Sequence, residues 1–400
     1  MRISTQQFYN QGARAIMNRQ SEVARTQAQL SSGHRLLDAS DDPAASARLL
    51  KVREQIAATE QFQRNIALAN GRLGVEESAL SESENVLQRA RELTVQGNNG
   101  TLSDRDRASI AIEIRQLRAQ LLDLGNTRDG SGEFLFAGSR TQTQPFADGG
   151  TSVNYQGDQS QRLVQVGPQR QVEVGDSGAE VFMQIPTGNG RFSVSANSAN
   201  TGTGNIAIGS VTDPAAFQYH DYRIEFTAAN TFDVIDETTS TTLLAGQTYS
   251  DGQAIQFAGI QTAISGVAAA GDRFNIQSGV KRDVFTVLDD IASALETATV
   301  TPAQTTQLHQ TLSTGLANLD QGLDHLLEIR GKVGARFNTL QAQEQTNTDF
   351  TLYMEKIGDD LDGLNYVDAA SRLNQELETL QAAQQSYMKI QNLSLFEYLR

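Results

Sequence analysis

The chain of 400 residues contains no cysteine, no tryptophan, only 6 prolines and only 4 histidines. The absence of cysteine excludes a disulfide framework and thiolate metal sites. No stretch reaches the roughly 18 apolar residues of a membrane-spanning helix, so membrane insertion is not expected. The N-terminal sequence lacks both an apolar signal core and a small-residue cleavage site. We therefore expect a protein that stays inside the cell or leaves it by a route other than general secretion.

The charge balance restricts the partners further. The formal net charge is −15 at pH 7. Nucleic-acid binding is not expected, because a negatively charged phosphate backbone binds surfaces rich in Lys and Arg. The length and an apolar content of 38% suffice for two or three domains with cores.

Residues that could carry catalysis are sparse. The histidines at 34, 220, 309 and 325 are isolated, with no carboxylate cluster at metal-ligand spacing. Residues 175–178 (Gly-Asp-Ser-Gly) resemble the nucleophile region of trypsin-like proteases, but Ala179 and Glu180 replace the expected Gly and Pro, so we expect a hairpin turn. Residues 202–204 (Gly-Thr-Gly) lack a third glycine and a following helix, which excludes a dinucleotide loop. We predict no enzyme, no catalytic residue, no metal site and no cofactor.

A seven-residue apolar repeat runs through both ends of the chain and is absent from its middle. Such a repeat keeps one stripe of a helix against a partner helix. The registers are Tyr9, Ile16, Val23, Leu30 and Leu37; Val52, Ile66, Leu73, Leu80 and Leu87; Leu326, Val333, Leu340, Met354 and Leu361; and Tyr366, Leu373, Leu380 and Tyr387.

Capping signals and breakers predict the helices. We expect helices over about 4–31, 43–96 (after Asp42-Pro43), from Ser103, from near Asp283, over 301–362, and from 366 to about 395. Between them, period-two alternation predicts short strands with Gly-rich turns. The strand positions are Phe134 and Phe136, Val153 and Tyr155, Val164 and Val166, Val172 and Val174, Tyr222 to Phe226, Phe232 and Val234, Ile255 and Phe257, and Phe274 and Ile276.

This order predicts an α+β fold, because long helices cannot bury a narrow stripe unaided. Both termini should form one long antiparallel helical stalk that carries an inserted, mainly antiparallel β domain. The predicted parts are an N-terminal assembly helix (1–40), the two halves of the stalk (41–139 and 281–362), the β domain (140–280) and a C-terminal assembly helix (363–400).

The inner registers are interpreted as intramolecular core, and the outermost segments as contacts between subunits. The outer segments lie beyond breakers at Ser32-Gly33 and Gly363 and contain too little apolar surface to hold alone. We expect them to be mobile in the monomer and ordered in an assembly. The predicted assembly stripe comprises Tyr9, Ile16, Val23, Leu30, Leu373, Leu380, Tyr387, Ile390, Leu393 and Phe396.

Sequence motifs at both ends resemble the bacterial flagellin superfamily. Residues 29–36 (Gln-Leu-Ser-Ser-Gly-His-Arg-Leu) and 39–44 (Ala-Ser-Asp-Asp-Pro-Ala) resemble its N-terminal signature, although members usually carry Lys where His34 stands. Residues 368–373 and 380–383 resemble its terminal helix. Within the superfamily, four segments favour the hook–filament junction family over flagellin: residues 1–5, 132–139, 153–158 and 394–399.

The resemblance implies a flagellin-like structural protein that is exported unfolded through the flagellar type III apparatus to the extracellular flagellum. It implies a ring of subunits between the first hook-associated protein and the flagellin filament, and an export chaperone at the C-terminal helix. Two alternatives remain: flagellin itself, and a ligand-binding or enzymatic β domain on a helical stalk.

Overall fold

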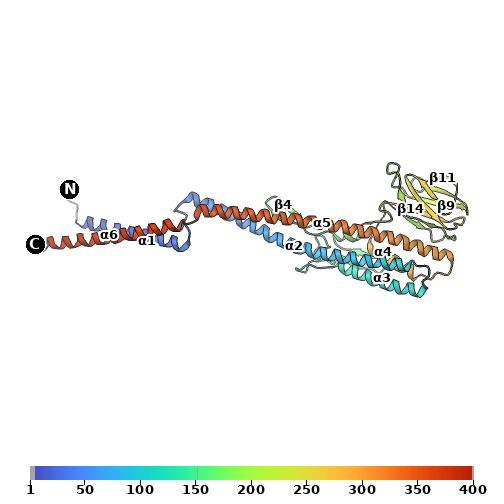
Figure 1. Cartoon of the computed structure of the whole chain (residues 1–400), viewed down its shortest axis with the longest axis horizontal. Helices are drawn as coiled ribbons and strands as arrows, with labels where there is room; N and C mark the ends of the chain where they lie inside the picture. The colour runs from blue at the N-terminus through green and yellow to red at the C-terminus, as the bar shows by residue number, and fades with distance from the viewer. Residues whose placement is uncertain (1–4, 151, 399–400) are drawn as a thin grey trace. The chain divides into compact units, whose positions relative to one another are not determined.

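The computed structural model describes residues 5–150 and 152–398, and along the sequence of this part α-helices precede and follow a β-rich middle segment (Figure 1). The predicted α+β class is confirmed. The α-helices are α1 (Thr5–Ser32), α2 (Pro43–Gly97), α3 (Asp104–Gly125), α4 (Val284–Glu296), α5 (Pro302–Asp362) and α6 (Tyr366–Tyr398).

Side-chain caps explain where the helices begin. The carboxylate of Asp42 accepts a hydrogen bond from the Ala45 N–H at 3.0 Å, just before α2. Ser103 and Asp106 form a reciprocal capping box at α3, and Asp283 caps α4 by accepting from the Thr286 N–H. Each cap satisfies a backbone N–H that the first helical turn leaves without a partner. These starts were all predicted from the sequence.

The chain divides into two compact units. Unit 1 comprises the described residues up to Arg64 and from Gln343 onward, and unit 2 comprises residues 65–342. Helices α2 and α5 contribute residues to both units. The division therefore falls inside helices, whereas the predicted domain boundaries lie between helices and stay predictions.

The helical core of unit 2 is built on the inner heptad registers. Helices α2 and α5 run antiparallel, because Arg330 binds Glu77 whereas Arg91 binds Asp320. The stripe between them is closed to solvent and packs with residues of α3 and α4, which confirms the intramolecular interpretation there. Each buried Leu or Ile stabilises by about 1.5–3 kcal/mol. The fully or almost fully buried stripe residues are Ile66, Leu73, Leu80, Leu87, Leu326, Val333 and Leu340.

The β domain of unit 2 consists of two antiparallel sheets around one apolar core. The larger sheet has the order β11-β10-β9-β14-β6, and the smaller has the order β12-β13-β7, with β8 also paired to β13. Their bounds are β6 Phe192–Ala196, β7 Asn205–Ile206, β8 Ser210–Val211, β9 Tyr222–Ala228, β10 Thr231–Asp236, β11 Thr241–Thr248, β12 Ala254–Phe257, β13 Ile260–Ser265 and β14 Arg273–Ser278.

Short strand pairs connect this domain and the helices. They are β1 (Phe146–Asp148) with β2 (Val153–Tyr155), β3 (Leu163–Gly167) with β4 (Arg170–Glu173), and β5 (Ile185–Pro186) with β15 (Lys281–Arg282). A short π-helix, η1 (Ala179–Met183), lies between β4 and β5.

Two sequence predictions in this region were wrong. Phe134 and Phe136 are buried but belong to a looped segment, where only Phe134 makes an isolated bridge, to Arg128. Positive φ at Gly132 and Gly138 turns the backbone on both sides, so alternation there reflects burial of a loop. Residues 175–178 are not a hairpin turn but lead directly into η1. Sequence analysis also missed eight strands of the described chain, namely β1, β5, β6, β7, β8, β11, β13 and β15.

A polar ladder on α5 holds the edge of the β domain. Oε1 of Gln310 accepts from the buried Ile206 N–H at 2.8 Å, and Oδ1 of Asn318 accepts from the Gly188 N–H at 2.8 Å. Between them, the Thr314 hydroxyl donates to the Val194 carbonyl at 3.3 Å. The three side chains are spaced four apart and therefore share one face of α5. They satisfy backbone groups of β6 in the larger sheet, of β7 in the smaller sheet and of the loop before β6.

We expect Gln310→Leu to leave the Ile206 N–H buried without an acceptor, at a cost of about 1–3 kcal/mol. Hydrogen exchange should report lost protection at Ile206 and neighbouring amides. Gln345→Leu, at an exposed position of the same helix, is the matched control. Full protection of Ile206 in Gln310→Leu would show that the ladder does not hold this edge.

Candidate assembly surface

Helices α1 and α6 pack on each other within the chain as an antiparallel pair (Figure 1). The Tyr9 and Tyr387 rings meet edge to face with centroids 6.3 Å apart, and Arg372 donates to the Gln29 amide oxygen at 3.1 Å. At Gly12 an added Cβ would lie 2.8 Å from the Tyr387 ring, so the glycine permits this close approach.

The predicted assembly stripe lies along this pair. Val23 is buried, and Tyr9, Ile16, Leu30, Leu373, Leu380 and Tyr387 are half-buried. The side chains of Ile390, Leu393 and Phe396 lie outside the described residues. The first partner of the stripe is therefore the same chain, and the apolar side chains keep part of their surface exposed. Their contact with neighbouring subunits stays a prediction.

The described residues of unit 1 form no apolar core comparable to those of unit 2. Both core clusters consist entirely of unit 2 residues. Among the described residues of unit 1, the buried apolar side chains are Val23, Ala45, Val52 and Ala369. Helices this long need partners for their apolar stripes, because isolated helices gain little stability from propensity alone.

Large apolar side chains are instead exposed in unit 1. It holds less than a third of the chain but more than half of the large apolar side chains that are exposed in the described part. Leu50 on α2 is 70% exposed, Leu352 and Tyr353 on α5 are 66% and 61% exposed, and Val367 on α6 is 78% exposed. A unit this rich in exposed large apolar side chains is a candidate interaction surface. Sequence reasoning missed these four residues because they lie off the heptad stripe.

A polar joint connects the segment between α1 and α2 with the turn between α5 and α6. Asp362 is 4% exposed, and its Oδ1 accepts from the Leu36 N–H at 2.9 Å. Its Oδ2 lies 2.9 Å from His34 Nδ1 and 3.6 Å from the Arg53 guanidinium. The Arg35 N–H donates to the Asp362 carbonyl at 2.7 Å.

Further bonds hold the same segment. Asp41 accepts from the Asp38 and Leu37 N–H groups and pairs with Arg25, and these interactions lower its pKa. Gly33 has φ of 75°, and an added Cβ would lie 2.7 Å from the Tyr366 hydroxyl. The joint therefore needs glycine at this position, both for its backbone conformation and for space. The predicted breaker at Ser32-Gly33 marks this turn.

The residues considered for catalysis are held by separate structural partners. His34 binds Asp362, His220 binds Asp236, His309 binds Asn98, and His325 binds the Glu180 carbonyl. Ser177 is buried and accepts from the Glu180 N–H at the start of η1. Among the described residues, no group of three His, Asp or Glu side chains is placed to hold a metal ion. None of the helices in the described chain is long and apolar enough to span a membrane.

Comparison with known proteins identifies two regions. Residues 3–141 match the bacterial flagellin N-terminal helical region, and residues 195–278 match the D2-like domain of flagellar hook-associated protein 1. The chain is also 39% identical over 185 residues to flagellar hook-associated protein 3 of Escherichia coli. That alignment covers 46% of this chain and 58% of the relative's length.

Solved structures extend the likeness to about three quarters of this chain. The FlgL crystal structure from Xanthomonas campestris matches with a TM-score of 0.71 and 35% identity, over 76% of this chain and 98% of that one. Hook-associated protein 3 from Legionella pneumophila matches with a TM-score of 0.74 and 33% identity, over 78% and 98%. These proteins are structural parts of the flagellum. Since near-complete chains align at these identities, this chain belongs to the flagellar hook-associated protein 3 (FlgL) family of the flagellin superfamily.

Proposed function

We propose that the chain is an adaptor of the bacterial flagellum that forms a ring at the hook–filament junction. In this arrangement the ring lies between the first hook-associated protein and the flagellin filament. The observation that carries the proposal is the exposed apolar surface of unit 1, whose described residues form no core cluster of their own. Neighbouring subunits and the two flanking polymers supply the contacts that this surface lacks. Each Leu or Ile that becomes buried there contributes about 1.5–3 kcal/mol.

The proposal includes export to the extracellular flagellum through the flagellar type III apparatus. Because the chain has no cysteine, no disulfide can hinder its passage as an unfolded chain through a narrow export channel. We further propose that an export chaperone covers the C-terminal helix in the cytoplasm. The exposed Leu377 and Met388 on α6 give such a partner apolar contacts.

Flagellin itself is the second candidate, because the N-terminal helical region of this chain matches that of the flagellin family. The match of residues 195–278 to a hook-associated protein domain favours the junction adaptor. A flagellin would polymerise into long filaments when purified monomer is seeded, whereas the adaptor would not.

A deletion strain distinguishes these functions. We expect hooks without filaments and flagellin monomer shed into the medium, seen by electron microscopy and by immunoblotting of culture supernatant. Normal filaments in the deletion strain would refute the junction role. Hooks with no flagellin in the medium would instead support flagellin as the identity of the chain.

We expect Leu380→Asp or Leu373→Asp to abolish ring assembly, because a charge on the half-buried stripe of α6 loses its hydration on packing. Swimming in soft agar should be lost, while circular dichroism of the purified variant retains the β-domain signal. Leu327→Asp, which changes an exposed leucine of unit 2, is the matched control. Unchanged motility of Leu380→Asp would count against assembly through this face.

The polar joint is proposed to fix how the terminal helices are presented for assembly. Asp362→Ala removes the acceptor of the Leu36 N–H and one partner of His34 and Arg53. If the substitution lowers the free energy of local opening by about 1.4 kcal/mol, which is within the range for one hydrogen bond, the open state becomes about tenfold more populated.

We therefore expect tryptic cleavage after Arg35 to be about tenfold faster in Asp362→Ala, as measured by mass spectrometry of the released peptides. Asp360→Ala, at an exposed position of the same helical turn, should cleave like the wild type. Equal rates in all three proteins would show that Asp362 does not hold the joint closed.

A further inference from the structure

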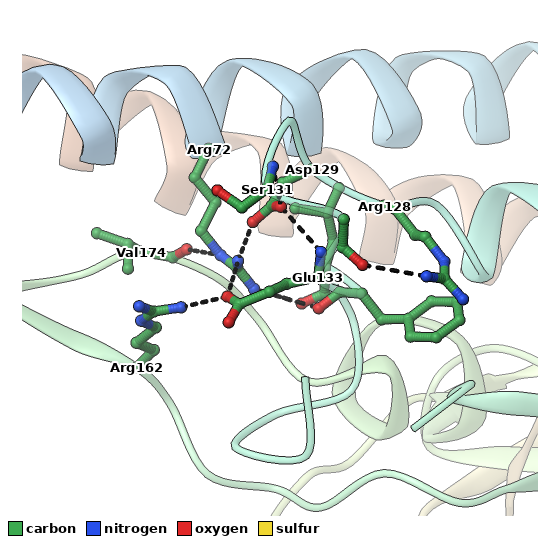
Figure 2. A network of polar contacts seen from close by, with 10 residues as sticks. Arg72, Arg128, Asp129, Ser131, Glu133, Arg162 and Val174 are labelled. Carbon is green, nitrogen blue, oxygen red and sulfur yellow. Dashed lines mark hydrogen bonds and ion pairs between the residues drawn. The ribbon is translucent and has the colours of Figure 1, made fainter. Parts of the chain in front are cut away.

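A charge cluster with a buried centre connects the loops of unit 2 to its two long helices. Figure 2 shows the first half of it, centred on Arg72 of α2. The Arg72 guanidinium binds the Asp129 carboxylate and donates to the Val174 carbonyl at 3.0 Å. Glu133 lies 3.5 Å from the same guanidinium and binds Arg162 at 2.6 Å.

The second half is centred on Arg336 of α5. Its guanidinium donates to both carboxylate oxygens of Asp176, at 2.7 and 2.8 Å, and to the Glu173 carboxylate at 2.8 Å. The Asp176 side chain is fully buried. Residues 129–176 are therefore tied to α2 at one arginine and to α5 at the other.

Glu76 of α2 lies between the two halves and is 1% exposed. Its Oε1 accepts from the Asp176 N–H at 2.9 Å, and its Oε2 has no hydrogen-bond partner among the described residues. A buried carboxylate with an unpartnered oxygen is far more costly than a buried neutral acid. Glu77, on the same helix, is instead paired with Arg330.

The surroundings of Glu76 contain more acids than bases. We call these residues the charge clasp: Arg72, Glu76, Asp129, Glu133, Arg162, Glu173, Asp176 and Arg336. Five carboxyl groups share three guanidinium groups, so an ionised Glu76 would add a second unbalanced negative charge. Three further charged side chains of the packed elements have other partners: Lys332 of α5 binds Glu180 of η1, Arg330 binds Glu77 and Glu84, and Arg128 donates to the Gly132 carbonyl. Burial, reinforced by the Asp176 charge, raises the pKa of Glu76 to about 8.

We propose that the charge clasp is a pH-sensitive latch: Glu76 is a neutral carboxylic acid in the folded chain, and loss of its proton as the pH rises toward 8 releases residues 129–176 from α2 and α5. Ionisation places an unpaired anion beside Asp176, and opening of the segment admits water to both carboxylates. This inference concerns unit 2 and does not depend on the proposed function.

The direction of the pH dependence follows from linkage. A glutamate in the unfolded chain ionises near its ordinary pKa of 4.5, whereas the pKa of folded Glu76 is about 8. Between these values the folded state holds one more proton, so stability falls as pH rises. One proton corresponds to a factor of ten in the folding equilibrium constant for each pH unit.

The test compares the wild type with Glu76→Gln, which keeps an oxygen acceptor for the Asp176 N–H but cannot ionise. From about pH 5.5 to 7.5 the folding constant of Glu76→Gln relative to the wild type should rise about tenfold per pH unit and level off above about pH 8. Hydrogen exchange, corrected for intrinsic rates, should show residues 129–176 losing protection with pH only in the wild type. Glu82→Gln, exposed on the same helix, should follow the wild type.

A constant ratio between Glu76→Gln and the wild type at all pH values would overturn the proposal. So would a pH-dependent ratio without local loss of protection, because Glu76 would then ionise without releasing the segment. If Glu76→Gln does not fold, Glu76→Met and the pH titration of the wild-type carboxyl carbon by NMR give the same comparison. A wild-type carboxyl that titrates below about pH 6 would also overturn it, because the folded state would then hold little extra proton near neutrality.

Discussion

Burial of a narrow apolar stripe is the constraint on which the rest of this molecule depends. A helix as long as α2 or α5 can hide such a stripe only against another helix, so the two run antiparallel and close it within unit 2. The same repeat continues into unit 1, where α1 and α6 leave most stripe residues half-buried. The same heptad repeat is therefore fully buried in unit 2 and only partly buried in unit 1.

The polar contacts have a different task from the apolar stripes. At Asp362 they hold a turn, at Arg72 and Arg336 they hold loops on helices, and along Gln310, Thr314 and Asn318 they hold a sheet edge. Each set pairs backbone groups or charges that would otherwise be buried without partners. These contacts position elements whose stability comes from apolar burial.

Sequence reasoning succeeded where the information is local. The caps at Ser103 and Asp283 and the stop near Gly33 depend on residues within one turn, and the structure places helix ends there. It failed at Phe134 and Phe136, where alternation came from burial of a loop rather than from strand pairing. It also missed β11, whose residues are nearly all exposed and lack a period of two, and it missed β6 although Phe192 and Val194 alternate with serines there.

The sequence by itself determined the helix boundaries, the α+β order, the apolar heptad stripe and the family, because each depends on residue spacing or on contiguous motifs. Only the tertiary structure decided what each stripe and charge faces. Glu76 meets Asp176 across 100 residues, and Leu36 meets Asp362 across 326. The identity of such partners depends on how antiparallel helices bring distant segments together, and no local pattern encodes it. That pairing leaves the apolar surface of unit 1 open while it closes the core of unit 2.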